Sequence, residues 1–165
     1  MDLHNCGTSD HMTLKLEDRL CFALYVSSKE MIKLMRPFLA PCGLTYTGYI
    51  TMLVLWENEG MSLKELGERL TLDSGTLTPL LKKLESNGYI KRTRDGADER
   101  IVRLTLTESG RALREELSDA DDRLFAAAAI DPQKTVLLTD YLNRLCRYIR
   151  TEQRTAPPAS DAAEL

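Results

Sequence analysis

The most reactive side chains in this sequence belong to four cysteines: Cys6, Cys21, Cys42 and Cys146. They lie far apart, form no C-x-x-C pair and have only His4 and His11 as companions, so we predict no metal site and no cofactor. In a reducing compartment each is a free thiol, either a small buried apolar side chain or a reactive group. The sequence alone leaves both interpretations open for each thiol, including Cys21, which Tyr25 follows one helical turn later.

A second group with possible chemistry is a set of basic residues in the middle of the chain. The formal net charge is -3, but residues 64–103 carry nine Lys/Arg against seven Asp/Glu. Phosphate contacts are made by one face and are screened from the rest of a protein within about 10 Å, so a local positive balance suits nucleic acid. An excess of two charges is also within chance variation, and the elements that carry the charges must decide.

Ahead of the basic region, the spacing of apolar residues predicts two helices. The first runs over about residues 14–38, and its end is marked by Pro37, Pro41 and Gly43. The second is nearly all apolar, with Thr45 as its N-cap and Gly60 as its stop. No run of about 20 apolar residues and no secretory signal is present, so we expect a cytoplasmic protein without a membrane segment.

Two short helices come next, joined by about four residues. Ser62 to Glu65 match the capping box S-x-x-E, which predicts a helix over 63–70. A leucine stripe then predicts a second helix over 76–86, ended by Asn87 and Gly88. Pro79 would cost roughly 3 kcal/mol in a helix interior, which moves the expected start to residues 74–76 and places Pro79 in or near the first turn. This order is typical of a helix-turn-helix.

A hairpin and two longer helices complete the prediction. Residues 89–94 and 101–106 read as two strands with a polar tip at Asp95 and Gly96. Helices are expected over 107–127 and 132–152, and the polar ends at 1–12 and 155–165 are expected to be disordered. The predicted fold class is therefore mainly α (α+β), a winged helix-turn-helix.

A helix-turn-helix followed by a basic hairpin predicts a DNA-binding protein and not an enzyme. The second helix can enter the major groove while arginines at the hairpin tip reach the minor groove. The predicted DNA contacts on the helix and hairpin are Asp73, Ser74, Thr76, Thr78, Lys82, Lys83, Arg92, Arg94 and Arg100. For Lys82, Lys83 and Arg103, a solvated surface position is an equal alternative.

The stretch LDSGTLTPLLKKLESNGYIKRTRDGADERIVRLTLTESG (72–110) resembles the recognition helix and wing of the MarR family, with the Asp-x-Arg of the wing at Asp98-Glu99-Arg100. LCFALYVSSKEM (20–31) and LTYTGYITMLVLWE (44–57) resemble its organic-hydroperoxide-sensing, OhrR-type branch. The resemblance spans residues 14–152 and adds Asp98 to the DNA-binding residues. It implies a homodimeric repressor on a palindromic operator, with a domain at 13–154 in which 44–106 bind double-stranded DNA and 13–43 and 107–154 dimerise.

The same resemblance implies a trigger. In the sensing branch, organic hydroperoxide oxidises a cysteine near the start of the first helix and the repressor releases DNA; Cys21 occupies that position. Tyr25 and Tyr46 match two of the tyrosines around the thiol, but Met35 stands where a third is expected, and a thioether cannot donate a hydrogen bond. A sulfenic acid at Cys21 would condense with a second thiol, for which Cys42 and Cys146 are the two candidates.

Three other functions remain open. A regulator of the same fold could be released by a small phenolic or aromatic ligand bound in the dimer cleft, with Cys21 inert. A thiol peroxidase is disfavoured because the sequence has no Cys–His pairing and no cradle of cofactor-binding glycines. A winged-helix protein-interaction module without DNA binding is disfavoured by the basic hairpin.

Overall fold

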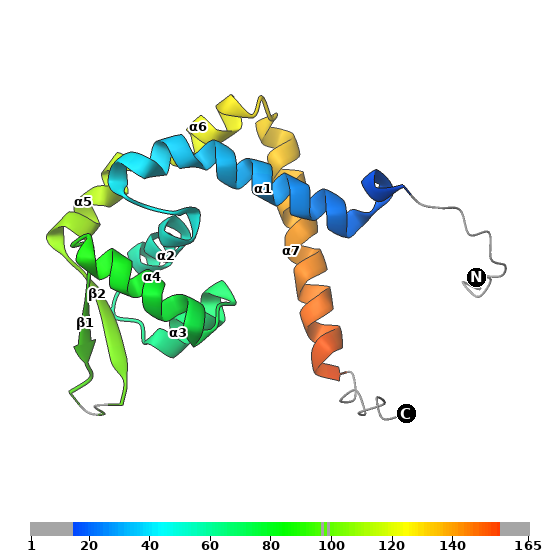
Figure 1. The fold of residues 1–165 in the computed structure, drawn as a ribbon. Helices are drawn as coiled ribbons and strands as arrows, with labels where there is room; N and C mark the ends of the chain where they lie inside the picture. The colour runs from blue at the N-terminus through cyan, green and yellow to red at the C-terminus, as the bar shows by residue number, and fades with distance from the viewer. Residues whose placement is uncertain (1–14, 97, 99, 156–165) are drawn as a thin grey trace. The chain divides into compact units, whose positions relative to one another are not determined.

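The computed structural model describes residues 15–96, 98 and 100–155, and its contacts divide the chain into two units, residues 1–120 and 121–165 (Figure 1). The predicted tails at 1–12 and 155–165, with Cys6, lie outside the described residues except for Thr155, which is the last residue of a helix. The functional boundaries at 44–106 remain a prediction. The elements in chain order are η1 (Leu16–Asp18), α1 (Leu20–Leu39), η2 (Ala40–Cys42), α2 (Tyr46–Glu57), α3 (Leu63–Leu70), α4 (Ser74–Ser86), β1 (Ile90–Arg94), β2 (Val102–Leu106), α5 (Glu108–Glu116), α6 (Ala120–Ala127) and α7 (Pro132–Thr155).

Side-chain caps set the starts of four helices. Thr45 accepts the N–H of Gly48 at 3.1 Å ahead of α2, and Asp73 accepts the N–H of Thr76 at 2.8 Å ahead of α4. The capping box of α3 is complete, because Ser62 and Glu65 each accept the other's backbone N–H, at 3.2 Å and 2.7 Å. Thr107 caps α5. The predicted starts of the helices at Thr45, Ser62 and Thr107 are therefore confirmed.

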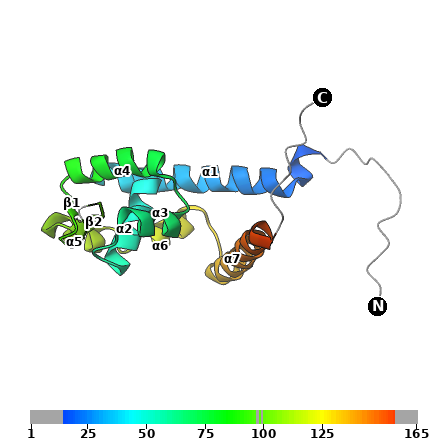
Figure 2. The same ribbon diagram turned by 90° about the horizontal axis from the view of Figure 1, so that it is seen from below.

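The core of the first unit lies where α2 packs against the helix-turn-helix and the hairpin. Both views show α2, α3 and α4 gathered beside β1 and β2 (Figures 1 and 2). The fully buried side chains at this centre come from every one of these elements: Met52, Leu55, Leu66, Leu77, Leu81, Leu84, Ile90 and Leu104. The predicted leucine stripe of the second short helix thus faces the core and leaves the opposite face of α4 exposed.

The hairpin has the predicted antiparallel pairing, from Ile90 opposite Leu106 to Arg94 opposite Val102. A third segment adds to its edge, because the N–H of Gly60 donates to the carbonyl of Leu104 and the N–H of Leu104 donates to that of Met61, both at 2.9 Å. The loop between α2 and α3 therefore runs alongside β2, and the base of the hairpin is attached to the helix-turn-helix by backbone hydrogen bonds.

Two of the predicted long helices are interrupted. The first helix begins only at Leu20, after the separate turn η1, because Arg19 is extended and Leu16 and Leu20 are exposed, with no packing to hold one continuous helix. The helix expected over 107–127 is two helices, α5 and α6. Between them the Ser118 hydroxyl donates to the carbonyl of Glu115 at 2.8 Å, a local bond that competes with the helical pattern.

The positions of two helix features also differ from prediction. α4 begins at Ser74, as expected, yet Pro79 lies in its second turn and not its first. The missing proline N–H leaves the carbonyl of Gly75 without its helical donor, while the Thr78 hydroxyl donates to the carbonyl of Ser74 at 2.8 Å. α7 continues to Thr155, three residues beyond the expected end.

Among the described residues, no single helix has the length and apolarity to cross a membrane, although α1 with η2 and α2, as a bent pair, meets that test by length and composition.

Candidate nucleic-acid interface and thiols

The first turn of α4 holds the predicted base-reading side chains, and most of them also shape the helix. Asp73 accepts the N–H of Thr76, and this bond holds the pKa of its carboxyl below the ordinary value. The Thr76 hydroxyl lies 3.3 Å from the same carboxylate. Asp73, Ser74, Thr76 and Thr78 are all exposed. The turn therefore presents short polar groups to solvent while it fixes the start of the helix.

Lys82 and Lys83 lie on the exposed face of α4, opposite the buried Leu81 and Leu84. Among the described side chains, none forms an ion pair or hydrogen bond with either lysine ammonium. Two free cations on one helix face suit phosphate contacts, since binding DNA releases its condensed counterions. Both remain predicted DNA contacts.

Arg92, predicted to contact DNA, instead forms an ion pair within the protein. Its guanidinium binds the carboxylate of Glu85 in α4, with Nε at 2.8 Å and an ion pair at 2.6 Å, and its backbone N–H donates to the same group. The arginine holds the pKa of Glu85 below its ordinary value. Arg92 thus ties β1 to α4, and its charge is neutralised locally, which disfavours a direct phosphate contact.

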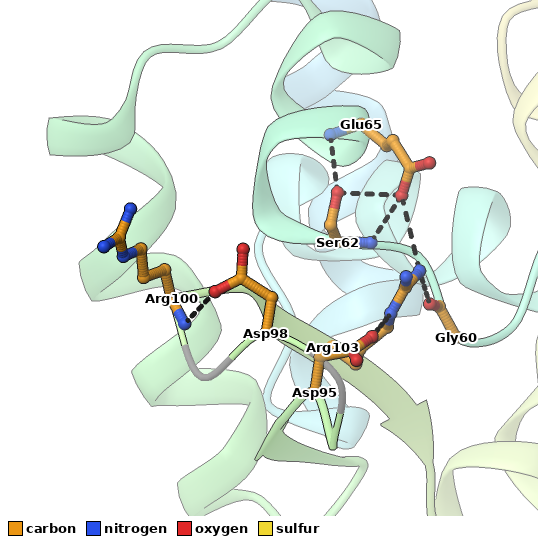
Figure 3. Close-up of polar contacts among 7 residues, drawn as sticks. All are labelled: Gly60, Ser62, Glu65, Asp95, Asp98, Arg100 and Arg103. Atoms are coloured by element: carbon orange, nitrogen blue, oxygen red, sulfur yellow. Dashed lines mark hydrogen bonds and ion pairs between the residues drawn. The ribbon is translucent and has the colours of Figure 1, made fainter.

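The hairpin tip places its basic side chains in two arrangements (Figure 3). Asp98 accepts the backbone N–H of Arg100 at 3.0 Å and so shapes the turn, while the Arg100 guanidinium extends away from the rest of the cluster. Arg94 is exposed, and no described residue pairs with it or with the Arg100 guanidinium. Arg103 instead turns toward the start of α3. Arg94 and Arg100 near the tip, together with the exposed Lys91 of β1, are thus hairpin cations with which no described residue is paired.

Cys21 lies exposed in the first turn of α1, and Tyr25 is 59% exposed on the next turn. The Lys29 ammonium lies 5.1 Å from the centre of the Tyr25 ring, within range of a cation–π contact. Tyr46, the first residue of α2, is half-buried. In the single chain Cys21 is therefore open to solvent and to small molecules.

Cys42 has the opposite environment. It is buried in η2, its thiol donates to a carboxylate oxygen of Glu116 at 3.4 Å, and Tyr89 donates to its carbonyl. Burial, reinforced by Glu116, raises the pKa of the Cys42 thiol to about 11. Burial, with Cys42 and Glu116 nearby, also raises the pKa of Tyr89. Since disulfide chemistry needs a thiolate, this setting disfavours Cys42 as a resolving thiol.

The length of α1 separates the thiols of one chain. From Cys21 to Leu39 the helix rises about 27 Å at 1.5 Å per residue, and both Cys42 and Tyr46 follow its far end. Within one chain Cys42 therefore lies too far from Cys21 to be the second thiol of a disulfide with it. Cys146 lies exposed on α7 in the second unit.

Met35, which takes the place of the expected third tyrosine, is 1% exposed and packs in the core at the end of α1. It contributes packing and no hydrogen bond to a thiol.

Sequence reasoning missed the partners of Arg103 and of Cys42. Arg103 stands opposite Thr93, which makes Asp95 its diagonal neighbour on the same face of the hairpin, so a prediction of the strand register could have found this contact. The contact between Cys42 and Glu116 joins residues 74 positions apart, and no local pattern announces it.

Comparison with known proteins gives one consistent picture. The family model described as "Transcriptional regulator SarA/Rot" matches residues 33–117. The regulator SarZ of Staphylococcus epidermidis is 47% identical over 127 residues, covering 77% of this chain and 86% of the relative. The organic hydroperoxide resistance transcriptional regulator of Bacillus subtilis is 51% identical over 110 residues, covering 67% and 74%.

A solved structure of reduced AbfR bound to DNA is similar over 83% of this chain and 96% of that one, with a TM-score of 0.69 and 31% identity. AbfR comes from Staphylococcus epidermidis. A disulfide-formed structure of AbfR matches with a TM-score of 0.56 and 34% identity, over 81% of this chain and 94% of that one.

Proposed function

This chain belongs to the MarR-like SarA/Rot family of winged-helix transcriptional regulators, and from that premise we propose that it is a homodimeric repressor released from its operator by organic hydroperoxide. α4 would enter the major groove, and the wing, residues 90–106, would reach the adjacent minor groove. Oxidation of Cys21 would be the signal. Its relatives are transcriptional regulators and not enzymes.

The observation that carries DNA binding is the set of exposed cations left unpaired by the described residues, on two neighbouring elements. Lys82 and Lys83 belong to α4, and Arg94 and Arg100 belong to the wing. Arginine is attracted to the negative potential of a narrow minor groove, and lysine contacts phosphate as a point charge. The arrangement supports simultaneous contact with a major groove and the minor groove beside it.

A homodimer is supported by apolar side chains that one chain leaves exposed. In α1 and α7 these include Leu20, Val26, Ile32, Leu137, Leu138, Tyr141 and Ile149. Large apolar side chains gathered on helices indicate a surface that another protein covers. A two-fold dimer would place two copies of α4 on half-sites about 34 Å apart, as a palindromic operator requires.

Thiol sensing is supported by the contrast between Cys21 and Cys42. The exposed Cys21 is accessible to peroxide, whereas the raised pKa of the buried Cys42 keeps that thiol protonated. The Cys21 thiolate would attack one peroxide oxygen and break the O–O bond, which yields a sulfenic acid and releases an alcohol. Condensation with a second thiol would then form a disulfide and water.

The length of α1 makes the sensing site depend on a second copy. Tyr46 follows the far end of α1 from Cys21, so it could hydrogen-bond only the Cys21 of another chain. A change in the Cys21 side chain would then act directly on the dimer contact and alter the spacing of the two lobes, to which half-site binding is sensitive.

A mobility-shift assay with the DNA upstream of the protein's own gene tests the proposal. The reduced protein should bind, cumene hydroperoxide should release it, and dithiothreitol should restore binding. Cys21→Ser should bind and ignore peroxide. Cys146→Ser tests the second thiol: if Cys146 is the resolving thiol, this variant should stop at the sulfenic acid and form no disulfide with Cys21.

Two results would contradict parts of the proposal. Failure of the reduced protein to bind any duplex at low salt would remove the DNA-binding role. If Cys21→Ser still releases DNA on peroxide, the thiol trigger is wrong, and release by a small phenolic or aromatic ligand, tested with the same variant, becomes the better explanation.

A further inference from the structure

Arg103 in β2 is bound on three sides by parts of the fold that are far apart in the chain (Figure 3). Its Nε donates to the Asp95 carboxylate at the hairpin tip at 2.6 Å. One terminal nitrogen donates to the carbonyl of Gly60 at 3.2 Å and lies 3.9 Å from the carboxylate of Glu65 at the start of α3. The guanidinium therefore connects the tip of the wing, the loop before α3 and α3 itself.

The side-chain contacts of Arg103 lie just beyond the last backbone contact between β2 and the loop before α3. The loop before α3 pairs with β2 through Gly60, Met61 and Leu104, and its last bridge joins Ser62 to Arg103. Beyond Arg103 the wing continues to its tip. The Arg103 side chain joins that tip to the start of α3 through its contacts with Asp95 and Glu65. The position of the tip relative to the helix-turn-helix thus depends on a side chain.

The other ends of this link are themselves fixed. The Asp95 backbone N–H donates to the carbonyl of Ile101 at 2.8 Å, which closes the tip. The Glu65 oxygen that faces Arg103 also accepts from the N–H and hydroxyl of Ser62, at 2.7 and 2.8 Å. The Asp95 carboxylate raises the pKa of Arg103, in keeping with a cation held in place. A planar guanidinium suits this role because its donors diverge in a fixed plane.

We propose that Arg103 is a positioning residue for DNA binding, which holds the tip of the wing at a fixed place relative to α4 without itself binding phosphate. This inference rests on the proposed role of the wing in DNA binding. Arg94 and Arg100 would meet the minor groove in a preorganised position. Without the contacts of Arg103, the tip of the wing would have to become ordered when DNA binds, and this would lower the affinity.

Substitution of Asp95 distinguishes a positioning role of Arg103 from a direct contact between Arg103 and phosphate. Removing a carboxylate from a DNA-binding surface strengthens binding if only net charge matters. If Arg103 positions the wing, Asp95→Asn should weaken DNA binding even though it makes the wing more positive, because Arg103 loses its shortest contact. Arg103→Lys keeps the charge but loses the planar fork, so it too should weaken binding.

The test measures operator affinity of the full chain at several salt concentrations for Asp95→Asn, Arg103→Lys, Arg103→Gln and the double variant Asp95→Asn/Arg103→Gln. We expect each single variant to lose about tenfold in affinity, the double variant to lose no more than Arg103→Gln alone, and the salt dependence to stay unchanged. Arg111→Gln is the control, since Arg111 also pairs with a carboxylate, that of Glu59, but away from the tip. Thermal unfolding should show that every variant remains folded.

Hydroxyl-radical footprinting on the same complexes provides a second measurement. If Arg103 positions the wing, the Asp95 and Arg103 variants should no longer protect the minor groove that flanks each half-site. They should still protect the centre of each half-site. If Arg103→Lys binds as the wild type does while Arg103→Gln lowers the salt slope by about one, Arg103 is a phosphate contact and the inference is wrong. Tighter binding by Asp95→Asn overturns it as well. Absence of binding by the wild type would instead refute the proposed function.

Discussion

The phenol of Tyr89 donates a hydrogen bond to the main-chain carbonyl of Cys42 at 2.8 Å. Next to it, the side-chain amide of Asn87 donates to the carbonyl of Gly43 at 3.1 Å. Both acceptors belong to the turn that ends α1, and both donors lie between α4 and β1. The helix that carries Cys21 is thereby tied to the junction of the recognition helix and the wing.

Tyr89→Phe tests the strength of this connection. The variant keeps the ring but leaves the Cys42 carbonyl without its donor, so we expect a loss of about 1–2 kcal/mol in the free energy of unfolding. Urea unfolding followed by Trp56 fluorescence measures the change. An unaltered unfolding midpoint would show that the carbonyl finds another donor and that the connection is weak.

The raised pKa of Cys42 predicts the order in which the thiols react. Since alkylation needs the thiolate, Cys42 should react with iodoacetamide far more slowly than Cys21 or Cys146 at pH 8, and mass spectrometry of peptides from the native protein can rank them. Glu116→Gln removes a negative neighbour and should speed Cys42 modestly, because burial remains the larger cause. Equal rates for all three thiols in the folded protein would contradict the assigned environment.

The same shift has a consequence for stability. A thiol whose pKa rises from 9.0 to about 11 on folding stabilises the folded state below pH 9, and this contribution is lost as the pH climbs from 9 to 11. The difference in stability between wild type and Cys42→Ala should shrink over that interval.

Much of this fold follows from local sequence signals. Ser62 and Glu65 specify the start of α3 without help from the rest of the chain, and the alternation of Val102, Leu104 and Leu106 sets the hairpin register. The interruptions of the two long helices were not predicted, because no local signal in the sequence marks them. Apolar spacing continues across Arg19 and across Ser118, so periodicity alone predicts unbroken helices where local hydrogen bonding or absent packing interrupts them.

The candidate site was predictable only in part. The pattern identified the basic residues of α4 and of the wing, but it could not tell which charges are neutralised. Arg92 meets Glu85 only once β1 folds back on α4, and Cys42 meets Glu116 only once α5 is in place. Whether a charge or a thiol is free is a tertiary property, and these were the interpretations that changed.

Asp73 should make the recognition helix sensitive to acid. Its carboxyl has a lowered pKa because it accepts the N–H of Thr76, so its contribution is present above the ordinary value of 3.8 and is lost as the pH falls through the lower folded value. Asp73→Asn keeps a good cap without a charge and Asp73→Ala removes the cap. Thermal unfolding from pH 7 to pH 2 should show Asp73→Ala least stable at pH 7, with wild type and Asp73→Asn converging in acid. A constant gap between these two would exclude the charge effect.

Gly110 is required by a close backbone contact. A Cβ at this position would lie 2.0 Å from the carbonyl oxygen of Tyr89, and the Trp56 indole N–H donates to the Gly110 carbonyl at 2.7 Å. Gly110→Ala must therefore displace α5 or the start of the wing, and we expect a loss of about 3 kcal/mol or more. Gly96→Ala is the control, since no described residue other than its chain neighbours lies within 4 Å of its added Cβ. Unfolding followed by the single tryptophan distinguishes them, and equal stability of the two variants would refute the contact.

The exposed stripe of α7 provides the test of the dimer. Leu137, Tyr141 and Tyr148 share one face of the helix and are 71, 69 and 66% exposed, whereas the exposed Asn143 lies on the opposite face. A carboxylate buried in an apolar interface is costly, so Tyr141→Glu should shift the protein toward monomers and weaken operator binding at least tenfold. Sedimentation velocity at micromolar concentration measures the assembly, and Asn143→Glu adds the same charge where no partner is expected. If Tyr141→Glu stays dimeric, or if Asn143→Glu dissociates equally, the dimer does not use this face, and the Tyr46 contact with Cys21 of another chain must be sought in a different assembly.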